Sequence, residues 1–128
     1  MTRPTVIVAC ADLMTASRFQ TSGADVDLVT TRSPDAAMAA LAAVVAAEGQ
    51  VTGEVSDLVV VVDLATCAEV PGRVRELYGN DLVVLGFAPH VQVDLLEAGR
   101  ATCTRVLPRG SVVKRFAQVI TEALQAGM

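Results

Sequence analysis

The sequence has no apolar stretch long enough to cross a membrane. Hydrophobic residues make up 52% of the chain and the mean hydropathy is +0.50, yet the longest unbroken apolar run covers only residues 36–47 and is mostly alanine. A transmembrane helix needs about 20 apolar residues. The first residues, MTRPTVIVAC, also lack the apolar core and the cleavage site of a signal peptide. We therefore expect a cytoplasmic protein that is not attached to a membrane.

The chain is also poor in positive charge. Its 10 Lys and Arg residues stand against 14 Asp and Glu residues, which gives a formal net charge of -4 and a pI near 4.8. Non-specific binding to nucleic acid requires clustered Lys and Arg side chains that neutralise phosphates. The composition therefore argues against binding to DNA or RNA.

Cysteine is scarce, and the three residues Cys10, Cys67 and Cys103 are far apart in the sequence. Their number is odd and they form no C-x-x-C pair, so neither a disulfide framework nor a zinc site is indicated. We expect three free thiols in a reducing compartment.

The chain does contain an alternation of short β-branched runs with longer helical patterns, which is typical of βαβ units around a parallel sheet. The expected strands cover residues 5–10, 26–30, 58–62, 82–87 and 104–107. The expected helices cover residues 12–23, 33–48, 71–78, 91–101 and 111–126. This pattern predicts one α/β domain over residues 1–128, with a flavodoxin-like, doubly wound, five-stranded parallel sheet in the order 2-1-3-4-5 and helices on both faces.

Several local signals refine these elements. Ser33-Pro34-Asp35 predicts a helix start, because Ser can accept an unpaired N–H, Pro fits the first helical position and Asp favours the positive end of the helix dipole. Gly49 predicts the end of that helix. The third strand is apolar throughout, which predicts a central position. The last helix is expected to bury one apolar face, made by Val113, Phe116, Ala117, Ile120 and Leu124.

Polar residues follow four of the expected strands. Asp12 follows the first strand, Asp63 the third, His90 the fourth and Arg109 the fifth. The carboxyl ends of parallel strands meet at one edge of the sheet, where sites of this fold form between strands one and three. Polar residues also appear wherever a buried strand reaches the surface, so the same positions can serve only as caps and turns.

The segments that form this edge resemble the receiver domain of bacterial response regulators. VIVACADLMTASRF is similar to the receiver's first strand, acidic pair and first helix, and DLVVVVDL to the strand that carries the phosphoacceptor aspartate. VLPRGSVVKRF stands where receivers have a Lys-Pro turn. A closer resemblance is to uncharacterised bacterial receiver-like proteins, through DLM and SR after strand one, GFAPHV after strand four and VLPRGS after strand five. The resemblance covers essentially the whole chain and implies a degenerate receiver.

A receiver that accepts phosphate needs two carboxylates for Mg²⁺, a nucleophilic aspartate, a hydroxyl after strand four and a lysine after strand five. By resemblance Asp63 is the nucleophile, but Ala11 replaces one acid, residues 86–88 offer no hydroxyl and Leu107 replaces the lysine. We therefore expect that Asp63 is not phosphorylated. The alternative is an atypical receiver in which Arg109 supplies the missing cation.

The polar residues at this edge form a candidate site that we call the rim cluster. Its members are Asp12, Arg18, Asp63, His90, Arg109 and Ser111. As a latch, the two carboxylates would pair with His90 and Arg109, and Ser111 would cap the last helix. As a ligand site, His90, Arg109 and the start of that helix would bind a small anion.

No cofactor or catalytic motif accompanies this cluster. The sequence has no Walker loop, no G-x-G-x-x-G, no flavin phosphate loop and no cobalamin run. It also shows no Ser-His-Asp or Cys-His arrangement. We expect neither enzymatic activity nor a cofactor or metal.

The resemblance also implies a contact surface, because receivers use their fourth helix, fifth strand and fifth helix for output and dimerisation. The corresponding interaction face is expected near Glu97, Arg105, Lys114 and Gln118. We expect a regulatory module without its own output domain, which reaches another protein in trans or a second copy of itself.

Overall fold

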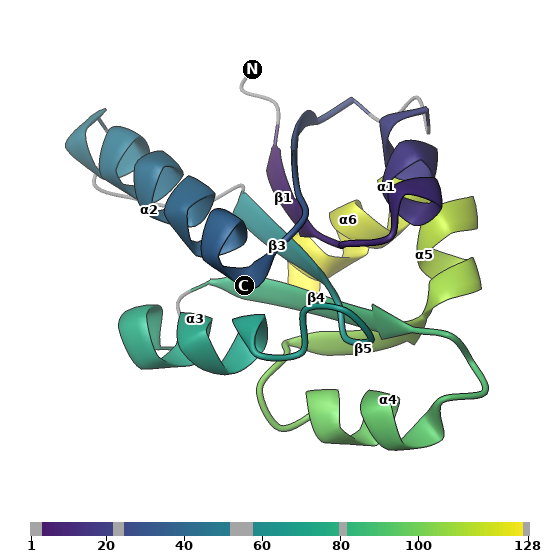
Figure 1. The fold of residues 1–128 in the computed structure, drawn as a ribbon. Coiled ribbons are helices and arrows are strands. Elements are labelled where there is room, and N and C mark those ends of the chain that lie inside the picture. The colour runs from purple at the N-terminus through teal and green to yellow at the C-terminus, as the bar shows by residue number, and fades with distance from the viewer. Residues whose placement is uncertain (1–3, 22–24, 52–57, 80–81, 127–128) are drawn as a thin grey trace.

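The computed structural model describes residues 4–21, 25–51, 58–79 and 82–126, with the side chains of residues 48–51 and 125–126 left out. Its strands are β1 (Thr5–Ala9), β2 (Asp27–Thr31), β3 (Leu58–Asp63), β4 (Val83–Ala88) and β5 (Arg105–Pro108). All neighbouring strands are parallel, in the order β2-β1-β3-β4-β5. The predicted fold class, strand order and central place of the third strand are confirmed (Figure 1).

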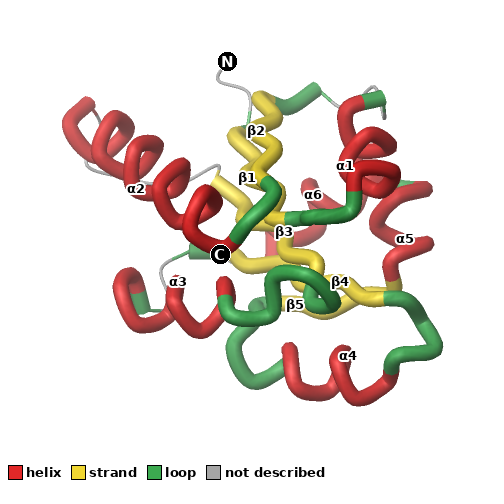
Figure 2. Tube along the Cα trace, in the orientation of Figure 1, coloured by secondary structure: helices red, strands yellow, loops and turns green. Residues whose placement is uncertain are grey.

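Helices cover both faces of this sheet (Figure 2). The described helices are α1 (Leu13–Gln20), α2 (Pro34–Val51), α3 (Val70–Tyr78), α4 (Val93–Gly99), α5 (Arg109–Lys114) and α6 (Phe116–Ala126). One core cluster joins α2, α3 and α4 to the sheet, and a second joins α1, α5 and α6 to its other face. Alternate residues of β3 enter the two clusters, since successive side chains of a strand point to opposite faces.

The three phenylalanines of the chain meet on the face covered by α1, α5 and α6. The ring centroids of Phe19 and Phe87 are 5.6 Å apart in an edge arrangement, and those of Phe19 and Phe116 are 4.9 Å apart. Aromatic pairs at such distances add to the stability gained from burial. They fix α1 and α6 against β4.

The expectation of one continuous last helix is wrong. Arg115 adopts φ -128° and ψ 44°, which are not helical, and separates α5 from α6. Of the expected apolar face, Phe116 and Ile120 are buried and Val113 and Leu124 pack against the same core cluster. Ala117 is exposed instead, while Val119 and Ala123 are buried.

Other helix ends also differ from the expectation. α1 ends at Gln20, with Thr21 as its C-cap, before Gly23, which lies outside the described residues. α2 continues through Gly49 to Val51, since one glycine inside a helix costs only about 1 kcal/mol. α4 is shorter than expected at both ends. The segment GQVTGEVS, residues 49–56, which we expect to be a loop after the second helix, lies largely within residues 52–57, which are not described.

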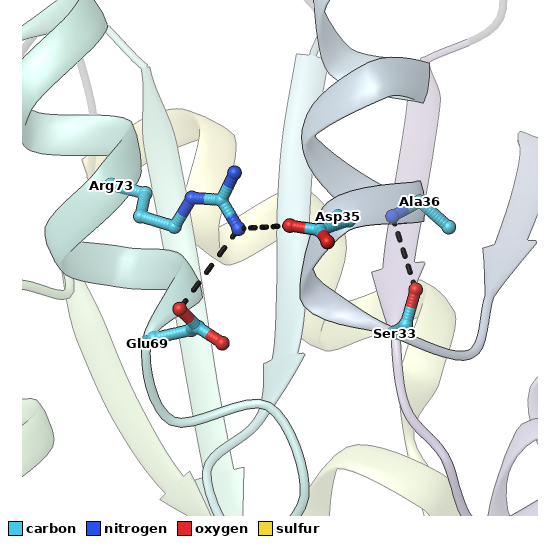
Figure 3. Close-up of polar contacts among 5 residues, drawn as sticks. All are labelled: Ser33, Asp35, Ala36, Glu69 and Arg73. Atoms are coloured by element: carbon cyan, nitrogen blue, oxygen red, sulfur yellow. Dashed lines mark hydrogen bonds and ion pairs between the residues drawn. The ribbon is translucent and has the colours of Figure 1, made fainter.

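The N-terminus of α2 confirms the predicted helix start and connects it to α3. Ser33 Oγ accepts a hydrogen bond from the Ala36 N–H at 3.1 Å (Figure 3). Nearby, Arg73 of α3 pairs with Asp35 of α2 at 2.8 Å and lies 4.0 Å from Glu69 (Figure 3). The pair is exposed, so it contributes little to stability.

A second arginine of α3 is bound more firmly. Arg75 donates from Nε to the Thr102 carbonyl at 2.7 Å and from Nη1 to the carbonyls of Gly79 and Leu82 at 3.0 and 2.8 Å. Its Nη2 donates to Thr104 Oγ1 at 3.0 Å. One guanidinium thus connects the end of α3, the start of β4 and the segment before β5.

Candidate functional site

Asp63 ends β3 at the edge where the predicted site lies, and its side chain is buried, with 4% of the residue exposed. Its Oδ1 accepts a hydrogen bond from the Ala65 N–H at 3.0 Å. Its Oδ2 accepts from Thr66 Oγ1 at 3.1 Å and from Cys10 Sγ at 3.4 Å. Both carboxylate oxygens therefore have donors, and within the described part of the chain none of these donors is a cation.

Thr66 joins the ends of two central strands. Its hydroxyl accepts a hydrogen bond from the Ala11 N–H at 3.1 Å and donates to Asp63 Oδ2. The Thr66 N–H also lies 3.2 Å from the Asp63 carbonyl, as in a tight turn. Sequence reasoning missed this residue. A hydroxyl three positions after a strand-ending aspartate was the available signal.

Cys10 follows β1 and lies beside Asp63. Burial raises the pKa of the Cys10 thiol to about 12, so the thiol keeps its proton at neutral pH. The S–H can donate to Asp63 Oδ2 or to the Asp12 carbonyl, which is 3.5 Å from Sγ. Burial also raises the pKa of Cys67, so neither thiol is a reactive thiolate. The described Cys residues form no disulfide.

Asp12 is the N-cap of α1, so for this residue the expectation that a strand-ending polar residue can serve as a helix cap is confirmed. Its Oδ1 accepts from the Met14 N–H at 3.1 Å and its Oδ2 from Thr15 Oγ1 at 2.9 Å. The Thr15 hydroxyl, followed by the Met14 N–H, lowers the pKa of the Asp12 carboxyl, and the charge of Arg109 adds a smaller effect. The carboxylate is held by its own helix.

The other members of the rim cluster lie further apart than a latch requires. Arg109 is the exposed first residue of α5, and His90 is exposed in the loop after β4. Neither forms a hydrogen bond or ion pair between its side chain and another described residue. Ser111 lies inside α5, whose N-cap is Pro108, so it does not cap this helix as expected. Arg18 is exposed on α1.

The expected pairing of Asp12 and Asp63 with Arg109 and His90 is therefore absent from the described residues. The physical reason is that nearer donors, on Thr15, Thr66, Cys10 and the backbone, already satisfy both carboxylates. A cation at the surface adds little to carboxylates that are already bonded in this way.

Apolar side chains occupy the positions where a receiver would carry its lysine and its hydroxyl. Leu107, near the end of β5, packs against the core cluster that contains Phe87. Ala88, the last residue of β4, is fully buried. In the described part of the chain, no group of three or more His, Cys, Asp or Glu residues is arranged to hold a metal ion.

The predicted interaction face is partly tied together by hydrogen bonds. Arg105 of β5 pairs with Glu122 of α6 at 3.1 Å, and Gln118 Nε2 donates to the same carboxylate at 3.1 Å. Glu97 pairs instead with Arg100, at 3.0 Å within the α4 region. Lys114 is exposed at the end of α5.

The helices of the interaction face, like the other described helices, pack against the sheet. Within the described residues, no helix combines the length and the apolar character that crossing a membrane requires.

Comparisons with known proteins give matches in structure. No protein-family model matches the sequence, and a search of curated proteins finds no match. The signal receiver domain of an HD domain-containing protein from Pseudomonas fluorescens Pf-5 is similar over 99% of this chain and 90% of its own, with a TM-score of 0.74 and 15% identity.

Further solved structures lead to the same fold. A response regulator receiver domain protein from Clostridium thermocellum is similar over 95% of this chain and 94% of its own, with a TM-score of 0.68 and 11% identity. The Legionella pneumophila response regulator LqsR matches 98% of this chain and 45% of its own, with a TM-score of 0.69 and 19% identity. The chain therefore has the fold of response-regulator receiver domains.

Proposed function

We propose that the protein is a receiver-like regulatory module that is not phosphorylated on Asp63 and acts through contacts with another protein. The observation that carries this proposal is the state of the Asp63 carboxylate, which is buried and accepts hydrogen bonds at both oxygens. A phosphoacceptor must turn one oxygen toward phosphorus and share the other with Mg²⁺. In this protein the Thr66 hydroxyl and the Cys10 thiol both donate to Asp63 Oδ2, so they compete with phosphorus or Mg²⁺ for that oxygen.

The surroundings of Asp63 also lack the charges that phosphoryl transfer requires. Transfer of a phosphoryl group needs positive charge to neutralise the phosphoryl oxygens. Leu107 and Ala88 supply apolar surface at the positions that resemble the receiver's lysine and hydroxyl, and Ala11 cannot bind a metal through its side chain. A phosphorylated Asp63 would leave buried negative charge without compensation.

Treatment with acetyl phosphate and Mg²⁺ tests the phosphorylation part of this proposal. Intact-mass spectrometry should show no phosphoryl adduct on the wild-type chain, and beryllofluoride with Mg²⁺ should leave the melting temperature unchanged. Asp63→Asn is the matched control, because it keeps the size of the side chain and removes the nucleophile. An adduct that forms on the wild type and is lost in Asp63→Asn would establish an atypical receiver instead.

The contact surface that we propose is the interaction face near Glu97, Arg105, Lys114 and Gln118, on α4, β5, α5 and α6. The Arg105–Glu122–Gln118 hydrogen bonds hold the side chains of two of its elements in place, which lowers the entropy lost when a partner binds. The partner is another protein in trans or a second copy of the chain. Arg105→Glu should weaken capture of a cross-linked partner from the native cell, whereas Arg73→Glu, on α3 and outside the interaction face, should not.

A small-anion sensor at the rim is the second candidate. It is favoured by Arg109, whose guanidinium is exposed and whose charge helps to lower the pKa of the Asp12 carboxyl. A ligand that binds the native state raises the melting temperature by mass action. Thermal shift with phosphate, nucleotides and small dicarboxylates, repeated on Arg109→Ala, tests this candidate: absence of any Arg109-dependent shift would remove it.

A further inference from the structure

A groove of about 530 Å³ lies between α1 and the junction of α5 with α6. Arg18 and Thr21 line it on the α1 side, and residues 113–118 line it on the other side. The break at Arg115 falls within this second segment, so the chain turns from one helix to the next along the wall of the groove. All lining residues belong to the described part of the chain, and none of them is acidic.

The groove gathers positive charge on a protein whose net charge is negative. Arg18, Lys114 and Arg115 are exposed, and no ion pair joins any of them to another described residue. The charge of Arg115 does act on Glu122, but that carboxylate is already bonded to other side chains. Neighbouring cations that lack counter-charges attract an anionic partner, at a rate and with a selectivity that depend on salt.

The positive groove continues into an apolar surface. A second hollow of about 370 Å³ runs along α1 and shares Arg18 and Thr21 with the groove. Leu13 and Met14 line this hollow and are 61% and 73% exposed. A free phosphate has no apolar surface to place there, whereas a peptide can offer apolar and acidic side chains at helical spacing.

We infer that this charged groove and its apolar extension bind an acidic peptide segment of a partner protein. The acidic side chains of the peptide lie against Arg18, Lys114 and Arg115, and its apolar side chains cover Leu13 and Met14. Burial of these two exposed side chains supplies affinity, while the cations set the orientation of the peptide.

This inference rests on the proposed function as a protein-contact module, and it names the chemistry of the partner. Lys114 and Gln118 belong both to the proposed interaction face and to the groove, so the groove continues that face around α6 toward α1. The peptide site is separate from Asp63, which none of the groove or hollow residues contacts through a hydrogen bond.

Fluorescence anisotropy with a defined probe tests the inference. The probe is a short fluorescein-labelled peptide of Glu and Leu at helical spacing, and the comparison peptide has Gln in place of Glu. At low salt and without Mg²⁺, the Glu peptide should bind and the Gln peptide should bind at least about tenfold more weakly. Amide shifts in an NMR titration should map to α1 and to residues 113–118.

Charge reversal provides the matched variants. Arg115→Glu should weaken binding of the Glu peptide about tenfold, and Lys114→Glu repeats the test in case Arg115→Glu unfolds. Arg73→Glu changes the net charge equally on α3, which packs on the opposite face of the sheet from α1, α5 and α6, and should leave binding unchanged within about twofold. Met14→Ala should weaken binding without changing its salt dependence.

Several results would overturn the inference. They are equal binding of the Gln peptide, equal loss in Arg73→Glu, displacement of the peptide by inorganic phosphate alone, or tighter binding of a single-stranded oligonucleotide with the same variant dependence. The assay contains no phosphodonor, so its failure leaves the result at Asp63 untouched. Phosphorylation of Asp63 would contradict the proposed function while the peptide result stands.

Discussion

At the scale of single residues, the chemistry of Asp63 depends on the protonated neighbours that bond to it. The Cys10 thiol and the Thr66 hydroxyl both donate to Oδ2, and the Ala65 N–H donates to Oδ1. Every buried side-chain nitrogen and oxygen atom among the described residues has such a partner. Satisfied buried groups stabilise one arrangement of the loops, because any other arrangement leaves polar atoms without partners.

We predict that Cys10→Ala makes stability less sensitive to alkaline pH. Burial raises the pKa of Cys10 to about 12 in the native state, whereas an unfolded thiol ionises near about 8.5. The native state therefore holds a proton that the unfolded chain releases, and stability falls as pH rises through this window. Urea unfolding between neutral pH and pH ~11 should show a steeper loss for the wild type than for Cys10→Ala.

Cys103→Ala is the control for this measurement, because burial raises the pKa of Cys103 to about 11 at a site away from Asp63. Its effect on the alkaline slope should weaken near pH ~11, where the effect of Cys10→Ala should still be close to its full size. Parallel pH profiles for the wild type and Cys10→Ala would contradict the assignment of Cys10 as a buried proton donor.

The identity of the strand-ending residues could be predicted from the sequence, but their bonding could not. Asp12 and Asp63 stood at the expected ends of β1 and β3 because parallel strands end at a common edge. The contacts of Thr66 with Ala11 and of Cys10 with Asp63 join residues 55 and 53 positions apart. Only the folded loops bring these atoms within hydrogen-bond distance.

At the scale of elements, two arginines connect α3 to neighbouring segments, and their contacts differ in number and exposure. Arg73 pairs with exposed carboxylates, while Arg75 bonds to three backbone carbonyls and one hydroxyl. A guanidinium has five donors in a planar fork, so it can join several chain segments at once. Arg75 thereby connects the end of α3 to the segments that precede β4 and β5.

We predict that Arg75→Ala lowers the free energy of unfolding by about 2–3 kcal/mol, because carbonyls that accept charged hydrogen bonds lose their donor. Arg73→Ala, on the same helix, should cost at most about 1 kcal/mol, as expected for a surface ion pair. Urea denaturation followed by circular dichroism measures both. Equal effects of the two substitutions would show that Arg75 contributes no more than an exposed charge.

The break between α5 and α6 is the element that sequence reasoning failed to predict. The local sequence VVKRF has no Gly or Pro, and its apolar spacing fits a continuous helix. Val112 of α5 and Phe116 of α6 are both buried in one cluster, and their spacing of four residues is also that of a continuous helix. The pattern of buried residues therefore gave no signal for the break.

At the scale of the whole molecule, the chain has the fold of receiver domains, with apolar side chains at the positions that resemble the receiver's lysine and hydroxyl. Strand order and layers follow from the βαβ alternation and the right-handed crossover rule, so they could be predicted. The role of the polar residues at the carboxyl edge of the sheet could not be predicted, because a polar residue at the end of a strand can bind a ligand, cap a helix or form a turn.

We predict that restoring the missing groups restores the chemistry. A chain with Ala11→Asp, Ala88→Thr and Leu107→Lys should gain a melting shift with beryllofluoride and Mg²⁺, because two acids and a cation then surround Asp63. Saturating ligand at about 100 times its dissociation constant adds about 2.7 kcal/mol to stability.

The same chain without Leu107→Lys is the control and should show little shift. If the fully restored chain folds and still fails to bind beryllofluoride, the absence of these charged groups is not what prevents binding at Asp63. In that case the hydrogen bonds from Thr66 and Cys10 would be the remaining cause, and Thr66→Ala in the restored chain separates the two.

The strand order also sets the sequence of events during folding. β1 pairs with β2 and β3, and both core clusters depend on side chains of β3, which lies beyond α2 in the chain. A growing polypeptide thus carries its first two strands through the synthesis of α2 before their central partner exists. Long-range pairing of this kind is slow to form, so we expect the apolar surface of β1 and β2 to stay uncovered until β3 is complete.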